Sequence, residues 1–418
     1  MLFKKKEYLK NPFNCIVFGF FFNIIGFAFI SNTHNQFLMV AFNCIGWYYI
    51  IKGYVRIAKH GVHFPFRGGY KFLFIFYLII CSILIIRGYT IDYNYQWISV
   101  QGCINFHLFS PYYILPYLMP LIVFIPYKYI NLNLFIKLAT ILAIIGTVTS
   151  LIFYQDIVAS SLKQAKGTGG TYGFGTSYAD IYVPMAFAVL CKKYISNKIW
   201  LINSIGLVFS LLIFLISARR GAAVVLLVLF LFNIYIYVKS LNLTQRFFAI
   251  FLSTILIFCA VAYYKSSNTF TFLKERGMED TRSGVDKALL QQMSDIELIF
   301  GKGLNGRYYY PLSNDDYLGG WRYASETGFY TLILKGGYIM AALHILLLIY
   351  PALLGLFYSN NILSKAFGLY IILSIFELYP FGWLTFNMKF LIIWIGVSLC
   401  YNKKFRSIND KSIHTYLF

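Results

Sequence analysis

Charged side chains at the ends of long apolar runs are the residues best placed to do chemistry in this chain. The stretch Ser217-Ala218-Arg219-Arg220-Gly221 puts two adjacent arginines between two such runs. Guanidinium groups suit bidentate contact with phosphate, so we expect Arg219 and Arg220 to hold a phosphate-bearing lipid. The alternative is that both side chains only extend to lipid phosphates as anchors.

Glu326 opens a further apolar run and has no obvious partner nearby in the sequence. A carboxylate in this place suits a general base that removes a hydroxyl proton. The alternative is a helix N-terminal carboxylate that the macrodipole favours. Lys335, nine residues later, is expected to pair with a carboxylate or to reach a phosphate. Glu377 and Lys389 are expected to pair with each other, because an unpaired charge inside a bilayer is costly.

A hydrophilic segment over residues 265–323 carries eight basic and eight acidic side chains. Within it, residues 282–300 predict one amphipathic helix, with Ser283 as N-cap, Asp286 three residues later as its capping partner, and Gly301-Lys302-Gly303 as its end. The apolar face of this helix comprises Val285, Leu289, Met293, Ile296 and Phe300. We interpret the helix as a lid that packs on the outer rim of the protein. A surface helix with a purely structural role is the alternative.

Membrane helices are the elements that must position these residues. The chain is 59% hydrophobic and only 12% charged, whereas a soluble domain is about a quarter charged. We therefore expect an all-α polytopic bundle, a single domain over residues 1–418 with a loop subdomain over 265–323, and an uncleaved first helix rather than a signal peptide. Apolar runs predict twelve spans, at 13–31, 32–51, 72–86, 112–127, 138–155, a weaker one between 180 and 192, 199–218, 221–238, 247–264, 336–364, 366–381 and 383–401.

The basic residues orient these spans. With the N-terminus inside, the inner segments hold 21 of the 36 basic residues and only Glu7 and Asp410 as acids. This asymmetry follows the positive-inside rule, so both chain ends are expected on the cytoplasmic side and the loop over 265–323 on the outer side. Arg87 ends the third span on the outer side, as an interfacial anchor or as part of an anion-binding rim.

Several other kinds of site are not expected. The seven cysteines lie mostly in apolar runs without a CxxC pair, and the six histidines are scattered, so no metal site is predicted. The net charge of +21 does not indicate a nucleic-acid partner, because the charges flank membrane spans. The glycine-rich stretch over 167–175 lacks the Lys-Ser/Thr of a P-loop. His344 in an apolar run is expected to be a hydrogen-bonded packing residue.

The order of three motifs resembles the superfamily of bacterial O-antigen polymerases and O-antigen ligases, over about residues 165–360. The first motif is the helix end Ser217-Ala218-Arg219-Arg220-Gly221, and the second is a large outer loop whose helix starts after Arg282 and ends at Gly301-Lys302-Gly303. The third is Glu326 followed by an apolar stretch and Gly336-Gly337. The ligases of this group typically carry a histidine after the loop, and this chain has Ser325-Glu326-Thr327 there. The resemblance therefore favours a repeat-unit polymerase.

The resemblance implies a bundle similar to those of the lipid-dependent (GT-C) glycosyltransferases, in the bacterial inner membrane. It implies that undecaprenyl-diphosphate-linked glycans of a lipopolysaccharide O-antigen or a capsule are joined at the periplasmic face, without metal or cofactor. A chain-length regulator is the implied protein partner, besides membrane lipids. Glu326, Arg282 and Arg220 would then be catalytic, and the substrate-binding side chains would be Arg219, Arg276, Arg87, Arg307, Tyr323 and Lys335.

Two alternatives stay open. An O-antigen ligase would use the same lipid-linked donor, and a flippase for lipid-linked oligosaccharides would also be basic, polytopic and rich in aromatic residues. A transporter is expected to show internal repeats and charges along several central helices. No obvious repeat is present in the sequence, and the charges gather at the outer rim.

Overall fold

The computed structural model describes residues 10–33, 36–59, 64–90, 112–165, 184–217, 219–239, 242–244, 283–310, 320–379 and 382–417. Within these ranges the protein is all-α apart from one two-stranded antiparallel hairpin. The described elements fall into two compact units, which we treat separately. The prediction of an all-α architecture is confirmed.

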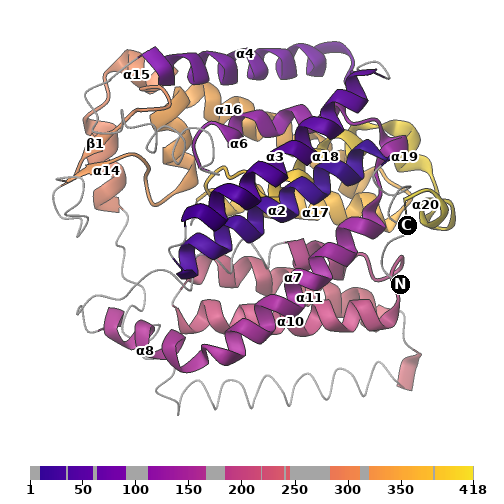
Figure 1. Cartoon of the computed structure of the whole chain (residues 1–418). Helices are drawn as coiled ribbons and strands as arrows, with labels where there is room; N and C mark the ends of the chain where they lie inside the picture. The colour runs from indigo at the N-terminus through magenta and orange to yellow at the C-terminus, as the bar shows by residue number, and fades with distance from the viewer. Residues whose placement is uncertain are drawn as a thin grey trace. The chain divides into compact units, whose positions relative to one another are not determined.

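Unit 1 spans residues 1–26, 39–131 and 280–417 and holds the loop helices together with the C-terminal third of the chain. Figure 1 labels most of its elements. They are α2 (Pro12–Thr33, up to residue 26), α3 (Gln36–Lys59, from residue 39), α4 (Gly68–Thr90), α6 (Leu115–Leu118), η2 (Met119–Phe124), η3 (Tyr127–Tyr129), α14 (Ser283–Gln291), α15 (Asp295–Phe300), β1 (Tyr308–Tyr309), β2 (Trp321–Arg322), α16 (Gly328–Phe357), α17 (Ile362–Glu377), α18 (Met388–Tyr401), α19 (Lys403–Ser407) and α20 (Asp410–Leu417).

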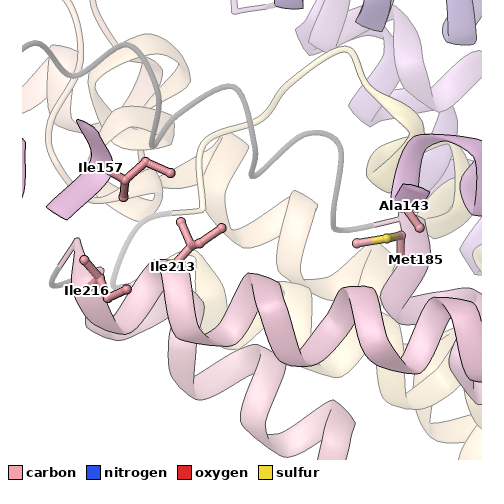
Figure 2. Packing of buried hydrophobic residues seen from close by; sticks show 5 residues of the cluster. All are labelled: Ala143, Ile157, Met185, Ile213 and Ile216. Carbon is pink, nitrogen blue, oxygen red and sulfur yellow. The ribbon is translucent and has the colours of Figure 1, made fainter. Parts of the chain in front are cut away.

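Unit 2 spans residues 27–38 and 132–279. A small core of Ile157, Ile213 and Ile216 at one end, with Met185 beside Ala143 at the other, joins α8 and α7 to α10 (Figure 2). Its helices pack through buried polar groups as well, because Asn203 Nδ2 donates to Thr140 Oγ1 at 2.8 Å. The labelled helices of this unit are α7 (Leu132–Ile152), α8 (Tyr154–Ala165), α10 (Asn197–Ile216) and α11 (Arg220–Lys239).

Five described helices are long and apolar enough to cross a membrane, namely Phe37–Lys59, Gly68–Arg87, Leu132–Ile152, Asn197–Ile216 and Gly328–Phe357. Their exposed faces are apolar too. On α4, the exposed large side chains recur every three or four residues, so one whole face of the helix is hydrophobic. They are Phe72, Phe76, Ile79, Ile83 and Ile86. A face of this kind suits contact with lipid tails. Five helices of sufficient length and hydropathy therefore indicate a multi-pass membrane protein.

Small residues bring the helices of unit 1 together. A Cβ atom at Gly19 of α2 would meet the carbonyl oxygen of Gly46 on α3 at 2.6 Å, and one at Gly368 of α17 would meet the carbonyl oxygen of Ala352 on α16 at 2.7 Å. Close backbone approach at small residues is the usual way in which membrane helices associate.

The two ends of α16 organise unit 1. The loop elements α14, α15 and β1 gather at the N-terminal end of α16, and α19 and α20 lie at its C-terminal end (Figure 1). At that second end, Asn361 Nδ2 donates to the carbonyls of Phe405 and Ile408, each at 3.1 Å. The loop and the C-terminal helices therefore lie at opposite ends of one candidate span, as the predicted topology requires.

Several predicted span limits are wrong in detail. The predicted span 336–364 runs across a turn, since α16 ends at Phe357 and α17 begins at Ile362. Between Met119 and Phe124 the backbone is a 3₁₀-helix, in a segment that contains Pro116 and Pro120 and therefore lacks two backbone donors. Of the weaker span before Lys192, residues 184–190 are helical. The predicted span 247–264 lies outside the described residues.

Two predicted internal contacts are confirmed. Lys389 Nζ donates to Glu377 Oε2, and only 9% of either side chain is exposed. His344 is buried, and its Nδ1 shares a hydrogen bond of 2.8 Å with the hydroxyl of Tyr77.

Candidate functional site

The amphipathic segment of the loop forms two helices, and the prediction of a single helix over 282–300 is wrong. The helix α14 ends at Gln291, and α15 starts again after Ser294, whose hydroxyl accepts from Glu297 N while Glu297 Oε2 accepts from Ser294 N. This capping box begins a new helix axis. As a result Val285, Leu289 and Met293 are buried as expected, whereas Ile296 and Phe300 are exposed.

The two glycine motifs of the sequence meet at the end of α15. Lys302 N donates to Leu334 O at 2.8 Å, and Gly303 N donates to Lys335 O at 2.9 Å. Gly337, with a φ of +68°, interrupts the helical backbone of α16, and a side chain there would collide with the carbonyl of Ile299. Only glycine tolerates both the positive φ and this contact, so the loop and α16 join backbone to backbone.

Lys335 takes part in the same junction. Its buried Nζ donates to Leu304 O at 2.7 Å and to Gly306 O at 2.9 Å. The prediction that Lys335 pairs with a carboxylate or reaches a phosphate is not what these contacts show, because its charge is used to hold two backbone carbonyls of the loop.

Arg87, on α4, also donates to backbone carbonyls of the loop. The guanidinium lies at the end of α4 and donates to Phe300 O at 3.3 Å and to Gly301 O at 3.2 Å. A cation at the last carbonyls of a helix also complements the helix dipole. Arg87 therefore caps the C-terminal end of α15, a role that neither sequence interpretation had included.

Glu326 lies just before α16 and has a charged neighbour. Its Oε1 is 3.6 Å from Arg322 Nη1, four residues earlier, so the expectation of no nearby partner is wrong. The Glu326 side chain is 39% exposed and that of Arg322 is 18% exposed. Within the described residues, the buried Nε of Arg322 has no hydrogen-bond partner. The half-exposed carboxylate of Glu326 can receive a proton, and the guanidinium of Arg322 beside it can attract an anion.

A second carboxylate, on α14, contacts the residues on either side of Glu326. Asp286 of α14 is buried and accepts a 2.5 Å hydrogen bond from Ser325 Oγ. The hydroxyl of Thr327 lies 3.5 Å from the same Asp286 oxygen. Asp286 therefore ties the loop helix to the two residues that flank Glu326.

Aromatic side chains surround the two acids. Tyr308 is fully buried, and burial raises the pKa of its hydroxyl to about 12, although the guanidinium of Arg322 partly opposes this. Its hydroxyl therefore stays protonated and donates to Ala324 O at 3.3 Å. The ring of Tyr310 lies under the Arg322 guanidinium at 5.4 Å.

The outer strand pair carries exposed rings. Tyr309 pairs with Trp321 across the hairpin, and the two ring centroids are 5.5 Å apart. The Arg307 guanidinium lies 4.5 Å from the centroid of the Trp321 ring. Gln292, just after α14, fixes this strand, because its side chain accepts from Tyr309 N and donates to Tyr309 O, each at 2.8 Å.

The structure brings together only part of the predicted site. Glu326, Arg87, Arg307, Tyr323 and Lys335 all lie in the loop junction of unit 1, and Lys335 Nζ is 5.7 Å from the ring of Tyr323. Arg219 and Arg220 belong to unit 2, so their convergence with Glu326 stays a prediction. Arg276 and Arg282 lie outside the described residues.

In unit 2, the predicted turn between two apolar helices is confirmed. Helix α10 ends at Ile216 and α11 starts at Arg220. Arg219 N donates to Phe214 O at 2.8 Å, which closes the turn. Both arginine side chains are half-buried at the helix ends.

Sequence reasoning missed Ser325 and Arg322, and it gave Asp286 only as the capping partner of Ser283. For Asp286 a signal was present, since it precedes Leu289 by three residues and Met293 by seven, which puts it on the buried face of α14. For Arg322 the spacing of four residues to Glu326 was also a signal. Nothing in the sequence marked Ser325, because its partner comes from 39 residues away.

No family model, curated protein or solved structure matches this chain.

Proposed function

We propose that this protein is a membrane glycosyltransferase that polymerises undecaprenyl-diphosphate-linked repeat units of a surface polysaccharide at the periplasmic face. In the reaction, the bond between the anomeric carbon of the donor glycan and its diphosphate breaks. A bond forms between that carbon and a hydroxyl oxygen of the acceptor unit. The hydroxyl proton passes to a base, and undecaprenyl diphosphate leaves with the electron pair of the broken bond.

One observation carries the proposal: the loop closes on the N-terminal end of a candidate span and holds a half-exposed carboxylate next to a mostly buried guanidinium. A lipid-linked donor presents its diphosphate at such a membrane-side position. The acceptor hydroxyl needs a base within hydrogen-bonding distance, about 2.6–3.2 Å.

Within this proposal Glu326 is the base, because its side chain is exposed enough to meet a substrate hydroxyl. The departing diphosphate needs positive charge in a site of low dielectric constant. Arg322 joins Arg219, Arg220 and Arg282 as a candidate for this role, since its Nε lacks a partner in the described part of the chain. Arg87 and Lys335 support the loop rather than the substrate, because they hold backbone carbonyls.

The exposed rings of Tyr309 and Trp321 supply a rigid apolar surface on which a sugar ring can stack. Arg307 beside Trp321 adds donors for sugar hydroxyl groups. Tyr308 is excluded from this role by its burial. Trp321 lies a few residues before the start of α16, so anchoring at the membrane interface is the competing role for the same ring.

The decisive test is reconstitution. Purified protein is mixed in detergent with the lipid-linked repeat unit from its own cells, and the products are separated on a gel. A ladder of increasing length supports a polymerase, and transfer of the glycan to lipid A-core instead of to itself would point to a ligase. If no product forms in detergent but labelled oligosaccharide crosses the membrane of sealed vesicles, the protein is a transporter and the proposal is wrong.

A further inference from the structure

We propose that Asp286 is a positioning residue, which fixes the direction of the Glu326 side chain through Ser325 and Thr327. The effect of Asp286 on glycan transfer depends on the proposed function. Its effect on the backbone around Glu326 does not, and the two can be measured separately.

The contacts of Asp286 cross from one element to another. Its Oδ1 accepts from Ser325 Oγ at 2.5 Å and lies 3.5 Å from Thr327 Oγ1. The Ser325 hydroxyl in turn accepts from Thr327 N at 3.2 Å. All three side chains are buried. Two hydroxyl groups and one carboxylate thus form a buried cluster between α14 and the residues before α16.

Glu326 lies between the two hydroxyl residues and points the other way. The Ser325 hydroxyl accepts from Thr327 N, so the chain bends at Glu326, and the hydroxyl groups of Ser325 and Thr327 both lie on the Asp286 side of this bend. Burial shows the same division, since Ser325 and Thr327 are 0% and 1% exposed while the Glu326 side chain is 39% exposed. Holding both neighbours on the inner side therefore directs Glu326 outward, toward Arg322.

The start of α16 does not need Asp286 for its own capping. Thr327 Oγ1 already accepts from Tyr330 N at 3.4 Å as the N-cap, and Thr331 Oγ1 donates to Thr327 O at 2.9 Å. A buried carboxylate is costly unless it is hydrogen-bonded, so a cap alone gives no reason to bury one here. The hydrogen bonds of the buried Asp286 carboxylate have a further consequence, which is that they hold α14 and Glu326 in a fixed relative position.

This arrangement matters for the chemistry because a catalytic group must be placed accurately. A displacement of about 1 Å in a reacting group can cost about 10²-fold in rate. Loss of the cluster is expected to change how well Glu326 meets the acceptor hydroxyl. It is not expected to change how the lipid-linked substrate is held, because the side chains of Asp286 and Ser325 are buried.

The experiment compares Asp286→Ala, Asp286→Asn and the control Asp295→Ala, an acidic residue exposed in the first turn of α15. The first readout is hydrogen–deuterium exchange of a peptide covering residues 325–331, in detergent and without substrate. Asp286→Ala should raise exchange there at least several-fold, while Asp286→Asn keeps an acceptor oxygen and should stay near wild type. Unchanged exchange in Asp286→Ala would overturn the inference.

The second readout is steady-state transfer with the lipid-linked repeat unit. Asp286→Ala should lower kcat by about 10–100-fold with KM unchanged, Asp286→Asn should restore most of it, and Asp295→Ala should match wild type. A raised KM with normal kcat would mean that Asp286 serves binding and not positioning. If Asp286→Ala does not fold, Ser325→Ala removes the same hydrogen bond with less loss of packing and takes its place in both assays.

The two readouts separate the inference from the function. If wild-type protein makes no ladder while exchange responds to Asp286→Ala, the proposed function fails and the structural cluster stands. If a ladder forms but neither exchange nor kcat responds to Asp286→Ala or Ser325→Ala, the function stands and the role of Asp286 is refuted.

Discussion

Glu377 and Lys389 join α17 to α18 inside unit 1, whereas Glu326 and Arg322 lie at its loop end before α16. In the first pair both side chains are 9% exposed and in direct contact. In the second pair the closest atoms are 3.6 Å apart, and the carboxylate is 39% exposed. Both pairs join one acid and one base in an apolar chain, so charge alone does not separate them.

The difference lies in what each pair leaves open. The Glu377–Lys389 pair is closed to any ligand, and its members satisfy each other in a place where neither could stand alone. The Glu326–Arg322 pair is loose and reaches solvent, so a substrate hydroxyl or phosphate can replace part of the contact. We infer that exposure and looseness mark the functional charges of this protein, and closeness marks the structural ones.

The largest effect should come from breaking the closed pair on one side only. Lys389→Met leaves a buried carboxylate without its partner and is expected to destabilise the fold by about 3–5 kcal/mol. Thermal unfolding in detergent, followed by size-exclusion chromatography, measures this. The matched double variant Lys389→Met with Glu377→Leu should recover most of the loss. Equal melting temperatures for wild type and Lys389→Met would contradict the comparison.

The second largest effect is expected at the Glu326–Arg322 pair, and it is measured as a loss of polymerisation. Glu326→Gln keeps size and polarity but cannot accept the hydroxyl proton, so ladder formation should fall by about 10²–10⁴-fold. Its melting temperature should stay within the error of the wild-type value, because an exposed ion pair contributes little. Retained ladder formation would leave Glu326 with a capping role only.

The half-buried arginines of unit 2 are also expected to affect activity rather than stability. Arg220→Ala, and likewise Arg282→Ala in the loop, should lower chain formation by about 10²-fold or more while the protein inserts and purifies normally. Lys198→Ala, a basic residue at the first turn of α10, serves as the control. Polysaccharide of normal length in cells that carry Arg220→Ala would remove that residue from the site.

The smallest effect is the coupling within the open pair itself. A double-mutant cycle of Arg322→Gln and Glu326→Gln on unfolding free energy should give about 0.2–1 kcal/mol. This coupling should shrink further when salt is raised from 0.1 to 1 M, since screening acts on exposed charges. A coupling as large as that of the closed pair would abolish the distinction between them.

Much of the fold could be predicted from hydropathy and charge, because a bilayer imposes lengths and apolar faces that a sequence displays directly. The Glu377–Lys389 pair and the packing role of His344 followed from the same reasoning, since a polar group at that depth must find a partner. The turn at Arg219 and Arg220 was visible as a polar break between two apolar runs.

The loop junction could not be predicted in the same way. The sequence predicts a carboxylate or a phosphate as the partner of Lys335, whereas its partners are backbone carbonyls of Leu304 and Gly306, which no side-chain pattern records. The new cap at Ser294 divided a helix whose apolar spacing continued without a break. The contact of Asp286 with Ser325 depends on how distant segments meet, so periodicity within one helix could not give it.

The break in α16 at Gly337 also has a consequence for how the length of this helix fits a bilayer. A helix of 30 residues is about 45 Å long, while the hydrocarbon core is about 30 Å thick. Because the loop closes on α16 at Gly337, the segment Gly328–Gly336 forms the surplus on that side, about 13 Å of rise. The part of α16 after the break, Tyr338–Phe357, is about 30 Å long and by itself matches the thickness of the hydrocarbon core. The shorter part before the break is the one that the loop holds.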